Sequence, residues 1–179
     1  MWKIGNIEID GKVILAPMGG FTSTGYRRYM KSFGASVLYS EMISDHGIIY
    51  GNSETFEYLK ASEDEFPLGI QLFGSNAEDI VKAMEIIAKS GYFYSFIDIN
   101  AGCPVPKVTK TGAGSSLLKN PTILAEIVKL LKTNFNIPVT VKIRLGWDDS
   151  SINFLEVIDL LQGAGVDAIA IHARTRKDL

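Results

Sequence analysis

The stretch YFYSFIDINAGCP, residues 92–104, changes character within a few positions. It begins as a nearly continuous apolar run and ends in Asn100, Gly102, Cys103 and Pro104. A strand that is apolar on both faces is typical of a parallel sheet covered on both sides. Because glycine permits a sharp turn and proline stops a strand, we expect the polar residues at the carboxyl end of this strand.

Five further apolar runs have the same character. They are KVILAPM (12–18), ASVLYSEM (35–42), PLGIQLFG (67–74), IPVTVKIRLG (137–146) and GVDAIAIHA (165–173). Between them we expect one helix from Asn76 to Gly91, one that begins at Asn120–Pro121, and one over 151–163. Strands and helices that alternate in this way predict an α/β fold with a parallel sheet.

Both a doubly wound sheet and a (β/α)8 TIM barrel fit this series. Polar or reactive residues follow many different strands, and a barrel brings all these strand ends to one mouth. No G-x-G-x-x-G motif follows the first predicted strand. The sequence therefore favours the barrel, of which the chain supplies about six β/α units.

A TIM barrel needs eight strands and about 200–250 residues. We therefore expect residues 1–179 to be one barrel domain that stops after its sixth strand, as the first part of a longer protein. The phosphate-binding loops of such a barrel usually follow strands seven and eight, so part of any cofactor site is expected outside this chain.

Composition excludes several classes of protein. No apolar run approaches the ~20 residues of a membrane span, and MWKIGNIEID does not have the pattern of a signal peptide. One cysteine excludes an internal disulfide and fits a reducing, cytoplasmic compartment. Two distant histidines with one cysteine give no metal-ligand spacing, and the net charge of −2 gives no global reason to expect nucleic acid.

Cys103 is the first candidate for chemistry. A lone cysteine is most often a small buried apolar side chain. Its place at a strand tip, between glycine and proline, favours a chemical role instead. The segment that follows it, with Lys107, Lys110 and Lys119, is interpreted as a mobile basic loop, either solvated or acting as a lid that faces an anion.

Three further candidates end other strands. Lys142 and Arg144 alternate, so their side chains share one face of the strand. Two cations in a packed core are costly, so we expect them at the mouth, facing an anion or an electron-rich ring, or paired with Glu41 or Asp98. His172 ends an apolar strand ahead of a basic cluster, which favours contact with a ligand.

Together these residues resemble one family, the tRNA-dihydrouridine synthases. The matching segments are LAPMGGFTSTGYRR, SEMIS, GIQLFG, DINAGCPVPKVTKTGAGSSLL, VTVKIRLGWDD and IHARTR, in the family's order and spacing. NAGCP followed by KTGAGSSLL is specific, whereas LAPM is shared with other FMN barrels. Ser23 stands where the family often has aspartate, and Ala173 where it often has glycine.

The resemblance implies an FMN-binding barrel and a small helical C-terminal domain, which we expect to be absent from this chain. It implies reduction of the C5–C6 double bond of uracil bases in tRNA, with NADPH or NADH as reductant and no metal. Hydride goes from reduced flavin to C6, and Cys103 is the implied acid that protonates C5.

The resemblance also implies roles for other residues. Pro17, Met18 and Gly19 would lie against the flavin, Gln71 at the edge of its ring system, Lys142 by its N1–O2 region, and His172 in contact with it. The uracil edge would be held by Asn100 and Arg144, with Lys107 and Arg174 as further substrate contacts.

RNA as a substrate gives the local charge a meaning. Three basic clusters would meet phosphates at the mouth: Arg27, Arg28 and Lys31; Lys107, Lys110 and Lys119; Arg174, Arg176 and Lys177. The acidic residues Glu54, Glu57, Glu63, Asp64 and Glu65 would face away from the RNA. Two alternatives stay open: another FMN barrel that acts on a free pyrimidine, as dihydroorotate dehydrogenases do, and a non-catalytic RNA-binding fragment.

Overall fold

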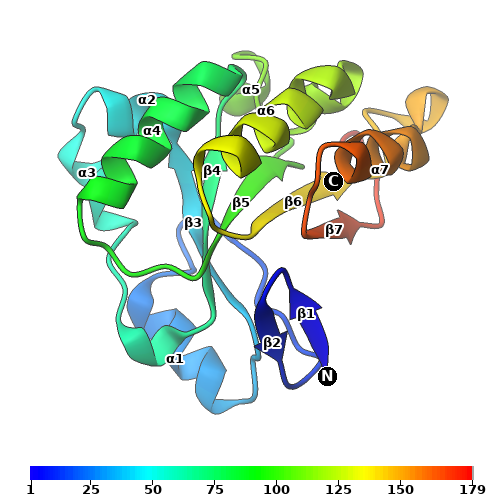
Figure 1. Cartoon of the computed structure of the whole chain (residues 1–179). Helices are drawn as coiled ribbons and strands as arrows, with labels where there is room; N and C mark the ends of the chain where they lie inside the picture. The colour runs from blue at the N-terminus through cyan, green and yellow to red at the C-terminus, as the bar shows by residue number, and fades with distance from the viewer. Residues whose placement is uncertain (179) are drawn as a thin grey trace.

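The computed structural model describes residues 1–178, which form an α/β fold around one parallel sheet (Figure 1). The sheet consists of β3 (Leu38–Ser44), β4 (Leu68–Phe73), β5 (Phe96–Ala101), β6 (Val139–Arg144) and β7 (Ala168–His172), in that order. Each strand pairs with the next one along the chain, without the reversal of order that a doubly wound sheet has. The sheet is therefore consistent with part of a TIM barrel.

Helices connect consecutive strands, and the longer ones among them line one side of the sheet (Figure 1). The longer ones are α4 (Ala77–Lys89), α6 (Pro121–Asn134) and α7 (Phe154–Gly163), and the shorter ones are α1 (Thr24–Ser32), α2 (Asp45–Ile49), α3 (Ser53–Glu57) and α5 (Pro106–Thr109). Three 3-10 helices complete the connections: η1 (Glu63–Glu65), η2 (Gly114–Lys119) and η3 (Asp149–Ser151). Among these described helices, none is long and apolar enough to cross a membrane.

The predicted ends of α4 and the predicted start of α6 are confirmed, whereas α7 begins at Phe154, three residues later than predicted. The Asn76 side chain accepts a hydrogen bond of 3.0 Å from the backbone N–H of Asp79 and so caps α4. Gly91 follows α4 with a φ of +73°, a conformation that favours glycine. Pro121 occupies the first turn of α6, where its missing N–H costs nothing.

Residue alternation gives the two faces of the sheet different characters. Ile97, Ile99, Val139, Val141 and Ile143 pack with the helices in the main core. The intervening positions of the same strands hold Asp98, Asn100, Thr140, Lys142 and Arg144. Because successive side chains of a strand point to opposite faces, these polar residues share the face away from the helices.

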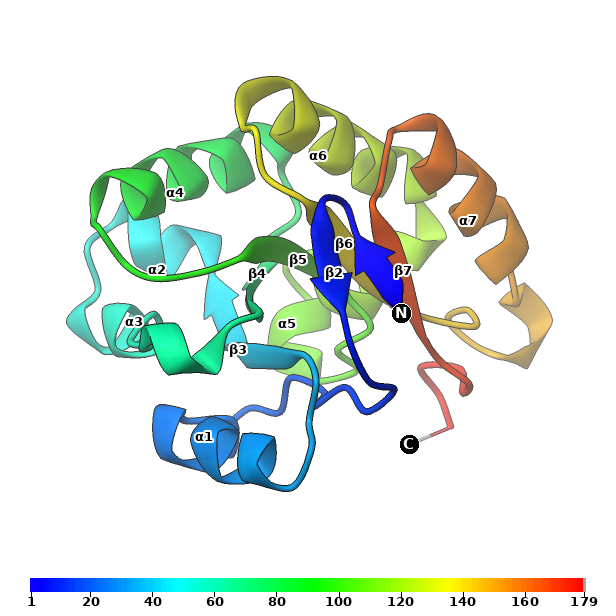
Figure 2. The ribbon, with the colours of Figure 1, turned by 60° about the horizontal axis from the view of Figure 1, so that its bottom comes forward.

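A two-stranded hairpin, which the sequence analysis did not predict, covers the amino end of that polar face. It consists of β1 (Trp2–Ile4) and β2 (Ile7–Ile9). Its isoleucines pack against Tyr39 and Phe96, at the start of β3 and β5. Figure 2 shows the hairpin in front of the sheet. Apolar packing thus closes the amino end, and the strands' carboxyl ends are left for a site.

Five of the six predicted strands are confirmed, and the first, over 12–18, is reduced to a single bridge. In the described chain this run makes a single parallel bridge, between Ile14 and Val37. Pro17 has no N–H to donate to a ladder, and the Met18 carbonyl accepts from the backbone N–H groups of Phe21 and Thr22, both at 3.1 Å. The backbone of residues 13–15 therefore pairs only briefly next to β3, and from Met18 onward it is used in a turn.

Candidate active site

A cavity of about 940 Å³ opens at the carboxyl ends of the strands. Ten of the eleven site residues predicted from the sequence line it: Pro17, Met18, Gly19, Gln71, Asn100, Cys103, Lys107, Lys142, Arg144 and His172. The strand-end rule of parallel sheets therefore predicted the position of this cavity.

Arg174 is the one predicted site residue that does not line the cavity as the structure describes it. Its side chain is exposed, and its backbone carbonyl accepts a hydrogen bond of 3.1 Å from the N–H of Leu145. In the described residues it belongs to the turn beyond β7.

Several cavity residues were missed. Met42 and Phe73 form part of its apolar wall, and Glu41, a polar residue expected at a strand end, was given no role in the site beyond ion pairing. These residues lie in β3 and β4, near the carboxyl ends. The same strand-end rule could have found them, but ordinary apolar side chains carry no chemical signal of their own.

The backbone of Cys103 is held by hydrogen bonds at both its N–H and its carbonyl group. Its side chain is 9% exposed and packs with Val108 and Ala113, yet it lines the cavity. Its backbone N–H donates to Asn100 Oδ1 at 2.9 Å. Its carbonyl accepts from the N–H and the hydroxyl of Ser115, at 3.1 and 2.9 Å. The thiol therefore has a defined position at the cavity wall.

A chain of buried hydrogen bonds runs from this loop into the sheet. Asn100 Nδ2 donates to Gln71 Oε1 at 2.8 Å, and Gln71 Nε2 donates to Asp98 Oδ2 at 2.6 Å. The hydroxyl of Thr140 donates to the other oxygen of Asp98 at 2.5 Å. Because a carboxylate only accepts, Asp98 sets the direction in which both amides point, and Asn100 is left with its oxygen toward Cys103.

Asp98 is fully buried, and burial raises the pKa of its carboxyl group to about 6. The hydrogen bonds from Thr140 and Gln71 and the charge of Lys142 lower this pKa and so offset part of the rise. The pKa of Lys142 is lowered by burial and by Arg144, while Asp98 opposes that change. The charge of Lys142 in the cavity wall thus interacts favourably with the buried carboxylate of Asp98.

Arg144 joins two of the loops at the cavity. Its Nε donates to the carbonyl of Gly102 at 2.8 Å, and its Nη1 donates to the carbonyl of Thr175, also at 2.8 Å. These bonds connect the loop after β5 with the loop after β7. Burial lowers the pKa of the Arg144 guanidinium.

His172 ends β7 at the cavity. Lost hydration lowers the pKa of its imidazole, and the charges of Arg144, Lys142 and Arg174 act in the same direction. The uncharged form of the ring is therefore favoured, and this form can donate or accept a hydrogen bond without adding charge.

The interpretation of the segment after Cys103 as a loose basic loop is wrong. It forms α5 and η2, and Val108, Leu117 and Leu118 are buried. Lys107 lines the cavity, whereas the Lys119 ammonium lies 3.4 Å from the ring centre of Trp147. These buried apolar side chains anchor the segment, so its lysines are presented from a folded element.

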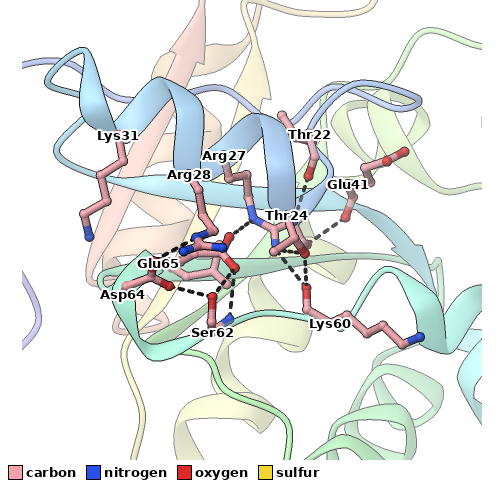
Figure 3. Close-up of polar contacts among 12 residues, drawn as sticks. Thr22, Thr24, Arg27, Arg28, Lys31, Glu41, Lys60, Ser62, Asp64 and Glu65 are labelled. Carbon is pink, nitrogen blue, oxygen red and sulfur yellow. Dashed lines mark hydrogen bonds and ion pairs between the residues drawn. The ribbon is translucent and has the colours of Figure 1, made fainter.

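The assignment of Arg27, Arg28 and Lys31 to RNA phosphates is also wrong. Figure 3 shows Arg27 and Arg28 directed toward η1, where they pair with Glu65 and Asp64. The Lys31 ammonium donates to the carbonyl of Phe66. Two arginines of the basic cluster are therefore neutralised by two carboxylates of the acidic cluster, because the fold brings α1 against η1.

Among the described residues, no group of three or more histidine, cysteine, aspartate or glutamate side chains could hold a metal ion. The polar groups at the cavity instead include three cations, a carboxylate, amides, an imidazole and a thiol, from Lys107, Lys142, Arg144, Glu41, Gln71, Asn100, His172 and Cys103. This set suits hydrogen bonding, charge stabilisation and proton transfer.

Comparison with known proteins adds a family. The sequence profile of the family described as "Dihydrouridine synthase (Dus)" matches residues 14–179. A "Probable tRNA-dihydrouridine synthase" of Aquifex aeolicus (strain VF5) is 43% identical over 171 residues, which cover 93% of this chain and 52% of that protein. The protein of the same name from Treponema pallidum (strain Nichols) is 37% identical over 178 residues, 97% of this chain and 52% of its own.

A third relative has a more specific name. The "tRNA-dihydrouridine synthase B" of Vibrio cholerae serotype O1 is 34% identical over 174 residues, which cover 97% of this chain and 53% of that protein. The chain spans about half the length of the curated relatives it matches.

Proposed function

Because the chain belongs to the dihydrouridine synthase family, we propose that the protein reduces the C5–C6 double bond of uridines in tRNA, with FMN as its cofactor. Residues 1–179 are then the first part of an FMN-binding barrel domain in the cytoplasm, and NADPH or NADH supplies the electrons. The observation that carries the proposal is the convergence of Cys103, Gln71, Lys142 and His172 on one cavity.

The cavity wall fits a flat aromatic cofactor that becomes anionic on reduction. Met18 offers an apolar surface that is 37% exposed. A Cβ built at Gly19 or Gly20 would meet no described atom within 4 Å, so a ring can approach the backbone there. Lys142 supplies positive charge beside the carboxylate of Asp98. Pro17, Met18, Gly19, Gln71, Lys142 and His172 would hold FMN.

Bound FMN supplies the hydride that a uracil C6 must receive. The chain's own task is to place the base and to deliver a proton to C5. Cys103 is the proton donor, because its thiol lines the cavity on a loop held by Asn100 and Ser115. Lys107 and the amide of Asn100 contact the base or its sugar-phosphate.

Arg144 and Arg174 have different parts in this proposal. Two of the Arg144 donors are engaged by backbone carbonyls, so its remaining Nη2 is the group available to the uracil edge. Arg174 lies beyond the described cavity and contacts tRNA phosphate at its rim. A base inside folded tRNA has to be extruded to reach the cavity, which costs a few kcal/mol of unstacking.

The test maps dihydrouridine by mass spectrometry in tRNA from cells that lack the protein. We expect specific positions to return to uridine and to regain dihydrouridine when the wild-type gene is restored. The purified protein should be yellow and should reduce tRNA but not free uridine. An unchanged dihydrouridine map, or reduction of the free base in place of tRNA, would contradict the proposal.

A further inference from the structure

Arg27 is buried outside the cavity, with four hydrogen bonds of its guanidinium (Figure 3). It is 2% exposed, and its Nε lies 2.5 Å from Glu65 Oε2. Its Nη1 donates to the Thr22 carbonyl at 2.7 Å, and its Nη2 to the Lys60 carbonyl at 2.8 Å and to the hydroxyl of Thr24 at 3.2 Å.

A buried ion pair of this kind is a weak source of stability, because removing two charges from water offsets much of their attraction. What the pair does define is geometry. Glu65 is held in turn, since its Oε1 accepts from the backbone N–H of Ser62 at 2.9 Å. The planar guanidinium therefore has one fixed orientation, and the Thr22 carbonyl has a fixed partner.

Thr22 connects this pair to the cavity. It is fully buried, and its hydroxyl lies 3.2 Å from the backbone nitrogen of Met18 and 3.1 Å from the Met18 carbonyl oxygen. The hydroxyl can accept from the first and donate to the second. Thr22 thus closes a turn whose residues Met18, Gly19 and Gly20 line the cavity.

The other end of the turn is held from β3. The backbone N–H of Gly20 donates to Glu41 Oε2 at 2.5 Å, and Gly20 has a φ of +79°. These residues have no strand ladder to fix them, since the pairing of this segment stops at Ile14. Hydrogen bonds with the side chains of Thr22 and Glu41 hold this segment in place of strand pairing.

We propose that Arg27, held by Glu65, is a positioning residue that acts through Thr22: it fixes the turn Met18–Gly20 in the shape that receives the cavity's ligand. The identity of that ligand as FMN rests on the proposed function. A preformed turn raises affinity because less conformational freedom is lost on binding.

Two substitutions at Thr22 test the hydroxyl by itself. Thr22→Val keeps the shape and removes both hydrogen bonds of the hydroxyl with Met18, whereas Thr22→Ser keeps the hydroxyl. We expect the first to weaken FMN binding by roughly tenfold and the second to bind as the wild type does. Without FMN, amide hydrogen exchange at Met18–Gly20 should be faster in Thr22→Val alone.

Arg27→Met should resemble Thr22→Val in both measurements. Arg28→Met is its matched control, because Arg28 joins the same helix to the same 3-10 helix through Asp64 at 2.8 Å but with both side chains more than half exposed. Arg28→Met should change neither FMN affinity nor exchange in the turn. If Arg27→Met does not fold, the comparison of Thr22→Val with Thr22→Ser still tests whether the hydroxyl fixes the turn.

Wild-type affinity and exchange in Thr22→Val would overturn the inference, as would equal defects in Thr22→Val and Thr22→Ser. A wild-type protein that binds no FMN would instead contradict the proposed function. In that case the exchange measurement, which needs no cofactor, still shows whether the turn depends on Thr22 and Arg27.

Discussion

The side-chain oxygen of Asn100 lies 2.9 Å from the backbone nitrogen of Cys103 and 3.1 Å from that of Gly102, so a residue of β5 fixes the loop that carries the thiol. The amide of Asn100 is oriented through Gln71 by the buried carboxylate of Asp98. The reactive side chain therefore depends on polar groups that lie deeper in the sheet.

Asn100→Ala should lower turnover of tRNA while FMN stays bound. The change leaves the N–H groups of Gly102 and Cys103 without their acceptor, which costs about 1–3 kcal/mol for each one that stays buried. Single-turnover reduction and urea unfolding measure the two effects. Asn76→Ala is a control, since it removes a helix cap of α4 and should cost about 1 kcal/mol of stability without changing turnover.

Cys103→Ala should reduce dihydrouridine formation by ~10²–10⁴-fold, the usual effect of losing a general acid. FMN affinity and the rate of flavin reduction by NADPH should stay close to the wild-type values, because the thiol contributes little to binding. Rapid-mixing absorbance separates flavin reduction from its reoxidation by tRNA. Unchanged reoxidation would show that the side chain only packs against Val108 and Ala113.

Lys142→Met should weaken FMN binding by about 10–100-fold, because a charged hydrogen bond contributes about 1.5–3 kcal/mol. Fluorescence titration of the flavin measures the dissociation constant. Lys110→Met is the matched control, since Lys110 is exposed and is not part of the described cavity wall. Equal affinity in the two variants would remove Lys142 from the cofactor site.

Asp98 should make the protein less stable as the pH rises from about 4 to 6. Burial raises the pKa of its carboxyl group from 3.8 to about 6, so the folded state binds this proton more tightly than the unfolded state does. The stabilisation is complete below the unfolded pKa and is lost as the pH passes the folded one, a change of about 3 kcal/mol.

Urea unfolding at several pH values, compared between wild type and Asp98→Asn, isolates this contribution. Asp64→Asn tests the sign, because the Ser62 hydroxyl and Arg28 lower the pKa of Asp64, and its contribution should therefore appear as the pH rises. Parallel pH profiles for wild type and Asp98→Asn would contradict the assignment.

Gly114→Ala should be destabilising by about 1–3 kcal/mol, because glycine is needed at this backbone conformation. Gly114 has a φ of +60°, and a Cβ there would lie 2.8 Å from the carbonyl oxygen of Cys103. Gly163→Ala, at the end of α7 with no described atom within 4 Å of its Cβ, should be neutral or slightly stabilising. Thermal unfolding of both variants compares them directly.

The sequence was sufficient to predict where the cavity lies. Lys142 and Arg144 had to share a face, and Gln71, Asn100 and His172 had to meet at one edge, because period-two strands in parallel order allow no other arrangement. These rules depend only on local pattern, which is why the predicted site residues, apart from Arg174, line the cavity.

What the sequence could not show depends on contacts between distant segments. Arg27 was assigned to RNA because no acid lies near it in the chain, but its partner Glu65 lies 38 positions away. The pairing follows from α1 packing beside η1, which no local pattern encodes. The buried role of Asp98 was hidden for the same reason, since its partners Gln71 and Thr140 come from the two neighbouring strands.

The hairpin β1–β2 makes the two ends of the sheet independently accessible to an experimenter. Met1 is 97% exposed and begins a unit that packs at the start of β3 and β5, far along the strands from Cys103 and His172. A fluorophore, bead or surface tether attached to this terminus would hold the molecule by its base. The carboxyl ends of the strands, where the cavity opens, would stay exposed to the solution. Immobilised protein can therefore be used to measure the association and dissociation rates of the proposed tRNA substrate.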